Sequence, residues 1–156
     1  MRGAALLRLL CAAIAVAALG SCVSVPQASP ARDAEAKQFG THPNAATIYV
    51  YRNDFTSHLF EDSTLFIDER LIGGTLPGTF FRVDVRAGDH VLHGHGYDQG
   101  RLGLTTRSGE AYFVALNVSN NTSYFRTVEP ESAKREIERC CVLMETWAPG
   151  QRPLLR

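Results

Sequence analysis

Between Ala45 and Thr127 the chain is a series of short runs rich in β-branched and aromatic residues, separated by Gly, Pro, Asp and Asn. Such runs predict β-strands. We expect strands at Thr47–Arg52, Thr64–Asp68, Arg70–Gly73, Phe80–Val85, His90–Gly96, Arg101–Thr106, Ala111–Val118 and Thr122–Thr127. Many short strands with turn residues between them predict a mainly β fold, a small antiparallel β-sandwich of about seven or eight short strands.

Within these runs apolar residues recur at every second position, so one side of each strand is predicted to face the core. The predicted inner-face residues are Ile48, Val50, Leu65, Ile67, Phe81, Val83, Val85, Tyr112, Val114, Leu116 and Val118. Asp68-Glu69 and Gly88-Asp89 are predicted to form tight turns, and Pro77-Gly78 a broader one. Gly73-Gly74 indicates a bulge or close backbone packing rather than a phosphate-binding loop.

Residues 130–147 change to a helical pattern. Pro130 suits the start of a helix, because proline there costs no hydrogen bond. The apolar stripe at helical spacing consists of Ala133, Ile137, Cys140, Cys141, Met144 and Trp147. We expect one C-terminal amphipathic helix that packs against the sandwich. The β-sandwich domain with this helix then covers residues 45–147, and residues 148–156 form a loose tail.

The N-terminal residues carry a targeting signal. An apolar run over residues 9–19 is shorter than the ~20 residues that a membrane span needs, so residues 1–21 are predicted to be a cleaved signal peptide. The run closes with Leu19-Gly20-Ser21-Cys22, which resembles a bacterial lipobox. This resemblance implies a lipoprotein signal peptide, with cleavage before Cys22 and acylation of that residue with palmitate-type chains. The alternative is an ordinary secretory signal in which Cys22 is incidental.

The mature chain is thus expected in the bacterial cell envelope, lipid-anchored in a membrane through Cys22. Val23 stands where many retained lipoproteins have aspartate, which favours the outer membrane, facing the periplasm. Residues 22–44 comprise the lipidated cysteine and a polar, Pro-containing segment without a sustained period, which predicts a flexible tether. A flexible chain of that length spans about 25 Å. The net charge after removal of residues 1–21 is near −2, which does not favour nucleic acid as a partner.

Cys140 and Cys141 are the remaining thiols after cleavage and acylation. Adjacent cysteines can bond to each other only through a strained ring. They could also pair across a dimer, bind a soft metal, or form one buried and one exposed residue of a helix. We predict the last arrangement, because a buried free cysteine behaves as a small hydrophobic residue.

Three segments carry a resemblance to a known family: 46–52 with its Tyr-Arg pair, the hairpin 65–73, and Val85-Arg86-Ala87-Gly88-Asp89-His90. Together they resemble the bacterial family called domain of unknown function 2846, over most of residues 45–140. The hairpin and Gly-x-His pieces are also similar to PEGA-type modules and other transthyretin-like sandwiches. The resemblance implies a small β-sandwich lipoprotein with no assigned catalysis. Glu69 stands where a turn glycine is usual in this family, and Ala87 where proline is usual.

The densest cluster of histidines is His90, His93 and His95. On a strand His93 and His95 share one face, while His90 points to the other. The two imidazoles could chelate Zn²⁺ or Cu²⁺ if a third ligand, Asp98 or His58, comes within reach. Alternatively, His90 is a structural turn residue that bonds the neighbouring backbone, and His93 and His95 are solvent-side strand residues.

The sequence contains no Ser-centred elbow, Walker loop or His-Glu-x-x-His motif. Asp68 and Glu69 are expected at a solvated hairpin tip, and Arg52 either grips a ligand or packs its stem on tyrosine faces. We therefore expect no enzyme and no cofactor, but a non-enzymatic binding or structural module. Its expected partners are the bilayer through Cys22 and an envelope protein or peptidoglycan. A metal-binding envelope protein using His90, His93 and His95 is the alternative, and no ligand-binding residues are assigned.

Overall fold

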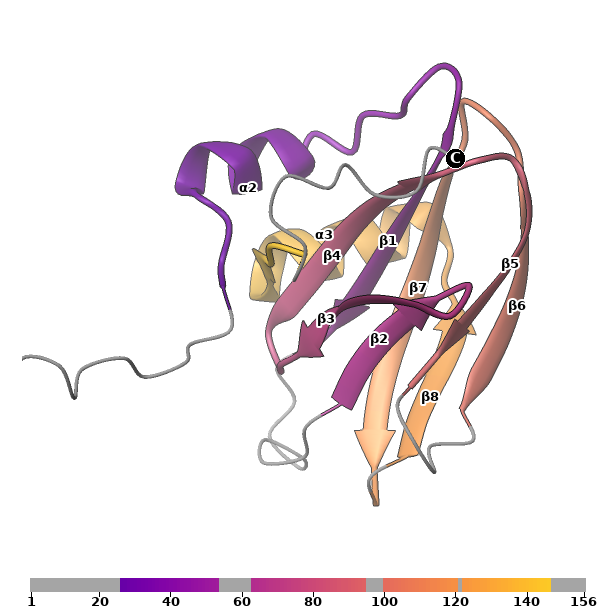
Figure 1. Cartoon of the computed structure of the whole chain (residues 1–156). Coiled ribbons are helices and arrows are strands. Elements are labelled where there is room, and N and C mark those ends of the chain that lie inside the picture. The colour runs from indigo at the N-terminus through magenta and orange to yellow at the C-terminus, as the bar shows by residue number, and fades with distance from the viewer. Residues whose placement is uncertain (1–25, 54–62, 95–99, 121, 147–156) are drawn as a thin grey trace, which may run out of the picture.

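The computed structural model of the chain describes residues 26–53, 63–94, 100–120 and 122–146. The predictions for the signal peptide, Cys22, His58, His95, Asp98, Trp147 and the C-terminal tail lie outside these residues. Within them the chain forms two β-sheets that face each other, and two helices lie on the outer side of one sheet (Figure 1). The predicted mainly β sandwich with a C-terminal helix is confirmed.

One sheet has the strand order β8-β7-β1-β4-β9 and the other the order β3-β2-β5-β6. The strands are β1 (Ala46–Arg52), β2 (Ser63–Ile67), β3 (Arg70–Thr75), β4 (Thr79–Val85), β5 (Gly88–His93), β6 (Arg101–Thr106), β7 (Ala111–Ser119), β8 (Thr122–Thr127) and β9 (Val142–Leu143). All eight predicted strands are present. Most neighbours are antiparallel, but β1 runs parallel to β7 and β4 parallel to β9. The parallel pair β1–β7 is possible because the whole second sheet lies between these strands in the chain and provides the long crossover.

The space between the sheets holds the main hydrophobic core. All the predicted inner-face residues belong to it; Tyr112 is only partly buried, whereas the others are almost fully buried. Met144 also reaches this core, although it follows β9 and not a helix. The period-two alternation was therefore sufficient to identify the inner face of each strand.

The outer face of the five-stranded sheet is covered as well, so β1 is buried along both sides. Helix α3 (Pro130–Cys140) packs Ala133 and Ile137 against Tyr49 and Phe80 in a second apolar cluster. Helix α3 begins at Pro130 as predicted, and the Glu129 carboxylate accepts the backbone N–H groups of the first turn.

The predicted extent of this helix, residues 130–147, is too long. Cys141 has an extended backbone, with φ −118° and ψ 145°, and the chain then pairs with β4 as β9. The helical spacing of Cys141 and Met144 was coincidental, because Cys141 is buried from an extended backbone before β9 and Met144 from a bridge position after it. Backbone pairing with the free edge of β4 replaces another helical turn here.

The predicted flexible tether is structured from Pro26 onward, which corrects the expectation for residues 22–44 within the described part. Helix α2 (Pro30–Ala36) begins after Ser29, whose hydroxyl accepts the backbone N–H of Arg32. Phe39 then packs edge-on against Tyr49, with ring centroids 5.4 Å apart. A few apolar side chains suffice to hold this segment, because the outer face of β1 presents aromatic rings to pack against. No helix in the described residues is long and apolar enough to cross a membrane.

The hairpin β2–β3 turns at Asp68 and Glu69, as predicted. Both residues have positive φ, 51° and 61°, as a two-residue hairpin with a type I′ turn requires. Pro77-Gly78 also forms its predicted turn, with Gly78 at φ 71°. The prediction for Gly88-Asp89 is wrong, because these residues begin β5, and the chain passes from one sheet to the other at Arg86 and Ala87.

Gly73 on β3 confirms the prediction of close backbone packing. A Cβ atom built at this position would lie 2.9 Å from two ring carbons of Phe81. The register between β2 and β3 also shifts between Leu65 and Phe66, opposite Gly73, which is a bulge. The glycine thus lets the two sheets approach at this point.

Candidate functional site

The histidines that the sequence singled out have different roles. Both ring nitrogens of His90 face acceptors: Nδ1 lies 2.6 Å from Asp68 Oδ2, and Nε2 lies 2.7 Å from the Arg86 carbonyl oxygen. Asp68 Oδ1 also accepts the backbone N–H of Val91 at 2.9 Å. His90 therefore ties the β2–β3 hairpin to β5 and to the β4–β5 connection. The interpretation of His90 as a structural residue that bonds the neighbouring backbone is confirmed, but His90 lies in strand β5 and not in a turn.

His93 lies on the outer face of the four-stranded sheet, opposite in direction to His90. Its ring stacks on Phe66 at 5.0 Å, and only 8% of the residue is exposed, so the expectation of a solvent-side position is wrong for His93. Its Nδ1 lies 2.7 Å from the Gly94 carbonyl oxygen, and its Nε2 lies 3.4 Å from Glu69 Oε2. The Phe66 ring on the neighbouring strand buries His93. The sequence could not predict this, because it does not show which residues are cross-strand neighbours.

A metal site receives no support from this arrangement. Among the described residues no three His, Cys, Asp or Glu side chains gather closely enough to hold a metal ion. His90 has both nitrogens engaged, and the proposed partners His95 and Asp98 lie outside the described residues.

Cys140 and Cys141 are joined by a disulfide bond, so the prediction of two free thiols on a helix is wrong. The helix ends at Cys140, and Cys141 is buried with its Sγ 3.6 Å from the carbonyl oxygen of Arg52. Arg52 is itself 4% exposed, and its Nη1 donates to the Thr75 carbonyl oxygen at 3.3 Å. Arg52 is thus a buried structural residue rather than one that faces a ligand.

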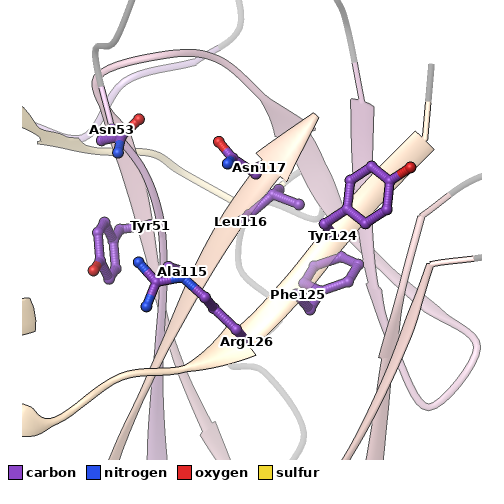
Figure 2. A pocket seen from close by; sticks show the side chains of 8 residues that line it. All are labelled: Tyr51, Asn53, Ala115, Leu116, Asn117, Tyr124, Phe125 and Arg126. Atoms are coloured by element: carbon purple, nitrogen blue, oxygen red, sulfur yellow. The ribbon is translucent and has the colours of Figure 1, made fainter. Parts of the chain in front are cut away.

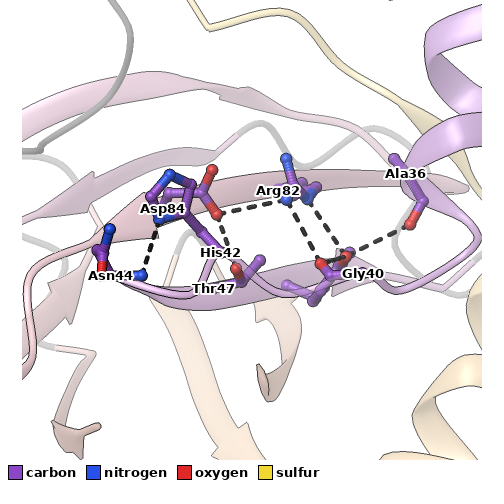
Figure 3. Close-up of polar contacts among 8 residues, drawn as sticks. Ala36, Gly40, His42, Asn44, Thr47, Arg82 and Asp84 are labelled. Carbon is purple, nitrogen blue, oxygen red and sulfur yellow. Dashed lines mark hydrogen bonds and ion pairs between the residues drawn. The ribbon is translucent and has the colours of Figure 1, made fainter. Parts of the chain in front are cut away.

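Several other polar groups on the outer side of β1 and β4 are also paired within the fold (Figure 3). Asp84 accepts the Thr47 hydroxyl at 2.7 Å and lies 3.5 Å from Arg82. The Tyr49 hydroxyl lies 3.3 Å from the Gly40 carbonyl oxygen and accepts from Arg82 Nε at 3.3 Å. Burial raises the pKa of Tyr49 above its usual value. These groups hold the segment before β1 in place and leave no acid or base free for catalysis among them.

A shallow pocket of about 110 Å³ opens on the outer face of the five-stranded sheet, on the side of β8 (Figure 2). Its lining residues are Tyr51, Asn53, Ala115, Leu116, Asn117, Tyr124, Phe125 and Arg126. Strand register explains this group. Tyr51 pairs with Ala115 across β1 and β7, and Ala115 pairs with Arg126 across β7 and β8, so these three side chains form one row on one face.

The Tyr51 hydroxyl is the unusual group in this pocket. The residue is 1% exposed, and its hydroxyl makes no hydrogen bond of normal geometry in the part of the chain that the structure describes, although the Glu136 carboxylate lies close to it. Burial raises the pKa of Tyr51, the neighbouring Glu136 carboxylate raises it further, and Arg126 opposes this. The phenol is therefore neutral and can both donate and accept a hydrogen bond.

The remaining polar groups lie on different sides of the pocket, and Arg126 is the one beside Tyr51 (Figure 2). Arg126 extends across β7 toward Tyr51, while Asn53 follows β1 and Asn117 lies in the last part of β7 (Figure 2). Tyr124 is 56% exposed and offers an aromatic surface at the rim. No described acid lies within ion-pair distance of Arg126. The arrangement can bind a small polar group, with an uncharged hydroxyl, a guanidinium and two amides as partners.

Sequence reasoning did not find this pocket. It singled out Arg52 next to Tyr51, whereas the cation beside the Tyr51 ring is Arg126 on β8, seventy-five positions after Tyr51 in the chain. The alternation on β7 and β8 could have placed Arg126 on the outer face. The parallel pairing of β1 with β7 could not be read from it, because pairing partners depend on topology.

Over 127 residues the chain is 32% identical to a protein of Haemophilus influenzae described as an uncharacterized protein, and the match covers 78% of this chain and 75% of that protein. The chain belongs to the family of this Haemophilus protein. No protein-family model matches the chain. No solved structure matches it either.

Proposed function

We propose that this protein is a lipoprotein of the bacterial cell envelope that acts as a non-enzymatic binding module. The lipobox-like Leu19-Gly20-Ser21-Cys22 supports membrane attachment through an acylated Cys22. A relative in Haemophilus influenzae supports a bacterial setting, where such processing occurs. Val23 favours the outer membrane, with the domain facing the periplasm. The resemblance to the family called domain of unknown function 2846 stays a prediction.

The observation that carries the binding role is the Tyr51 hydroxyl, which is buried at the pocket beside the Glu136 carboxylate and makes no hydrogen bond of normal geometry with any described residue. A buried polar group without a hydrogen bond costs about 1–3 kcal/mol. A ligand group that bonds this hydroxyl would remove that cost, and Arg126 would strengthen the contact if the ligand atom carries negative charge. The proposed partner is a polar group of peptidoglycan or of another envelope protein. No observation favours the metal-binding alternative over this role.

Membrane attachment is tested by replacing Cys22 with Ala in the full-length chain. Metabolic labelling with palmitate should mark the wild type. The Cys22→Ala variant should lose the label and appear in the soluble fraction after the membranes are sedimented. A Cys140→Ser/Cys141→Ser variant is the matched control, because it removes the other two mature-chain cysteines and should keep the label. A Cys22→Ala variant that remains in the membrane fraction would contradict the proposal.

The binding role is tested with purified lipoprotein and peptidoglycan sacculi in a sedimentation assay, and with crosslinking in intact cells for protein partners. Tyr51→Phe and Arg126→Gln should each weaken binding by about tenfold, the effect of losing one good hydrogen bond. Tyr112→Phe serves as a control, since the Tyr112 hydroxyl bonds Glu110 and lies away from the pocket lining. The pocket role is refuted if all three variants bind like the wild type in both assays.

A further inference from the structure

The N-terminal segment is fastened to the edge of the five-stranded sheet. The Ala28 N–H donates to the Leu143 carbonyl oxygen at 2.9 Å, and the Glu145 N–H donates to the Pro26 carbonyl oxygen at 2.9 Å. Gln27 and Met144 form the antiparallel bridge between these two bonds. The segment Pro26–Ala28 therefore continues the sheet beyond β9 as one more paired edge.

Helix α2 adds side-chain contacts to the same edge. Asp33 Oδ1 accepts the backbone N–H of Leu143 at 2.7 Å, and Arg32 forms an ion pair with Glu145. On its other side β9 is bonded to β4, so the N-terminal segment is linked through β9 to the centre of the sheet. We call Pro26–Ala36 together with β9 the anchored edge.

The length of chain between the anchored edge and Cys22 is short. Cys22 precedes Pro26 by four residues, and a backbone reaches at most about 3.6 Å per residue, so the Cα atoms of these residues are at most about 14 Å apart. A compact domain of this size is about 35 Å across. The connection is thus much shorter than the body that it holds, and shorter than the 25 Å expected for a flexible tether over residues 22–44.

We propose that the anchored edge faces the bilayer surface, at the level of the lipid headgroups, and that the domain is held in one orientation. This inference rests on the proposed acylation of Cys22. Side chains on this surface suit a headgroup region. Exposed Ser29, Pro30 and Ala31 are small and uncharged, and the charges of Asp33 and Lys37 lie 2.8 Å apart and offset each other. Exposed Arg32 is paired with Glu145, and exposed Glu35 is the charged side chain of this helix outside these pairs.

This orientation has a consequence for the pocket. From the N-terminal segment to β8 the sheet crosses five strand spacings, which is about 24 Å at about 4.8 Å each. Arg126 on β8 is therefore held on the side of the domain away from the anchored edge. The pocket, which opens on the outer face of the sheet, is therefore held away from the lipid, where a partner in the periplasm can reach it.

The test measures the height of two dyes above a bilayer by energy transfer to a headgroup-labelled lipid. The acylated full mature protein is placed in vesicles of phosphatidylethanolamine and phosphatidylglycerol, with a dye on Ala31→Cys or on Thr127→Cys, both exposed positions. We expect the dye at 31 to lie closer to the bilayer than the dye at 127, by about 20 Å. Insertion of a twenty-residue Gly/Ser linker between Ser24 and Val25 should move the dye at 31 outward, by up to about 25 Å, and abolish the difference.

Equal heights for the two dyes in the acylated protein without the linker would overturn the inference and leave the proposed lipoprotein intact. An unchanged height at 31 after linker insertion would overturn it too, since the short connection would not set the height. Absence of an acyl chain on Cys22 in the purified protein would instead refute the proposed function, and this inference with it. Mass spectrometry of the N-terminal peptide separates these cases before the dyes are measured.

Discussion

Replacing Tyr51 with Phe should stabilise the protein in the absence of its ligand. The Tyr51 hydroxyl is buried and makes no hydrogen bond of normal geometry with a described residue, although the Glu136 carboxylate lies close to it. An unsatisfied buried polar group costs about 1–3 kcal/mol. We expect the free energy of unfolding to rise by about 1 kcal/mol, at the lower end of this range, because the variant also loses the packing contacts of one oxygen atom. For a domain of this length that gain raises Tm by about 4 °C.

Tyr49→Phe is the matched control in the same strand. The Tyr49 ring is as buried as that of Tyr51, but its hydroxyl lies within hydrogen-bond distance of the Ala36 and Gly40 carbonyl oxygens and Arg82. Loss of these bonds should destabilise the protein by about 1 kcal/mol. Urea unfolding followed by circular dichroism measures both changes. If Tyr51→Phe destabilises the protein as much as Tyr49→Phe does, the hydroxyl has a partner and the argument for the pocket is refuted.

Tyr51 should also make the stability of the wild type depend on pH at alkaline values. Burial raises the pKa of Tyr51 above its usual value of 10.0, so the folded state disfavours the ionised phenol. Its contribution to stability is complete below pH 10 and is lost as the pH rises through the raised pKa. The wild type should lose up to about 1.4 kcal/mol per pH unit above pH 10 at this group, and the variant should not. Urea unfolding at pH 8 and pH 11 measures the gap between them, and a constant gap would contradict the assignment.

Three further changes probe the fold. Gly73→Ala should destabilise the protein by about 1–3 kcal/mol, because its Cβ would lie 2.9 Å from the Phe81 ring, whereas Gly103→Ala meets nothing within 4 Å and should change the free energy of unfolding far less. His90→Ala should cost about 2 kcal/mol, since it removes two hydrogen bonds and the packing of a buried ring. Backbone N–H groups lower the pKa of Glu129, so Glu129→Ala should destabilise helix α3 at neutral pH, and the difference from the wild type should vanish as the pH falls below 4.5. Urea unfolding measures the free energy of unfolding for each variant. Equal losses for the two glycine variants would refute the packing argument at Gly73, and an unchanged stability of His90→Ala would refute the role of its hydrogen bonds. A loss in Glu129→Ala that does not depend on pH would refute the role of the Glu129 carboxylate.

Errors in the sequence-based prediction occur where a segment takes its conformation from a neighbour. Residues 26–44 have no apolar period, yet Ala36 and Phe39 pack on aromatic residues that face outward from the sheet. Cys141 and Met144 fit a helical stripe, yet the unpaired edge of β4 draws the chain into β9. In both cases local propensity is weak, and contacts with residues far along the chain decide the outcome.

The candidate pocket also depends partly on local sequence pattern and partly on contacts between distant strands. Outward positions on a strand can be read from alternation, so Tyr51 and Arg126 could each be placed on an outer face. Their meeting depends on the pairings β1–β7 and β7–β8. A sequence does not state which strands are neighbours, because many pairings bury the same apolar side chains.

By itself the sequence determined the eight main strands, the inner face of each, the turn at Asp68 and Glu69, and the start of helix α3. These features follow from short-range physics: alternation over a few residues, turn propensity and proline at a helix start. Tertiary structure alone decided the burial of His93, the fastening of Pro26–Ala28 to β9, and the row that joins Tyr51 to Arg126. Each of these depends on hydrogen bonds and packing between distant segments, whose register is set only when the two sheets and their covering helices come together.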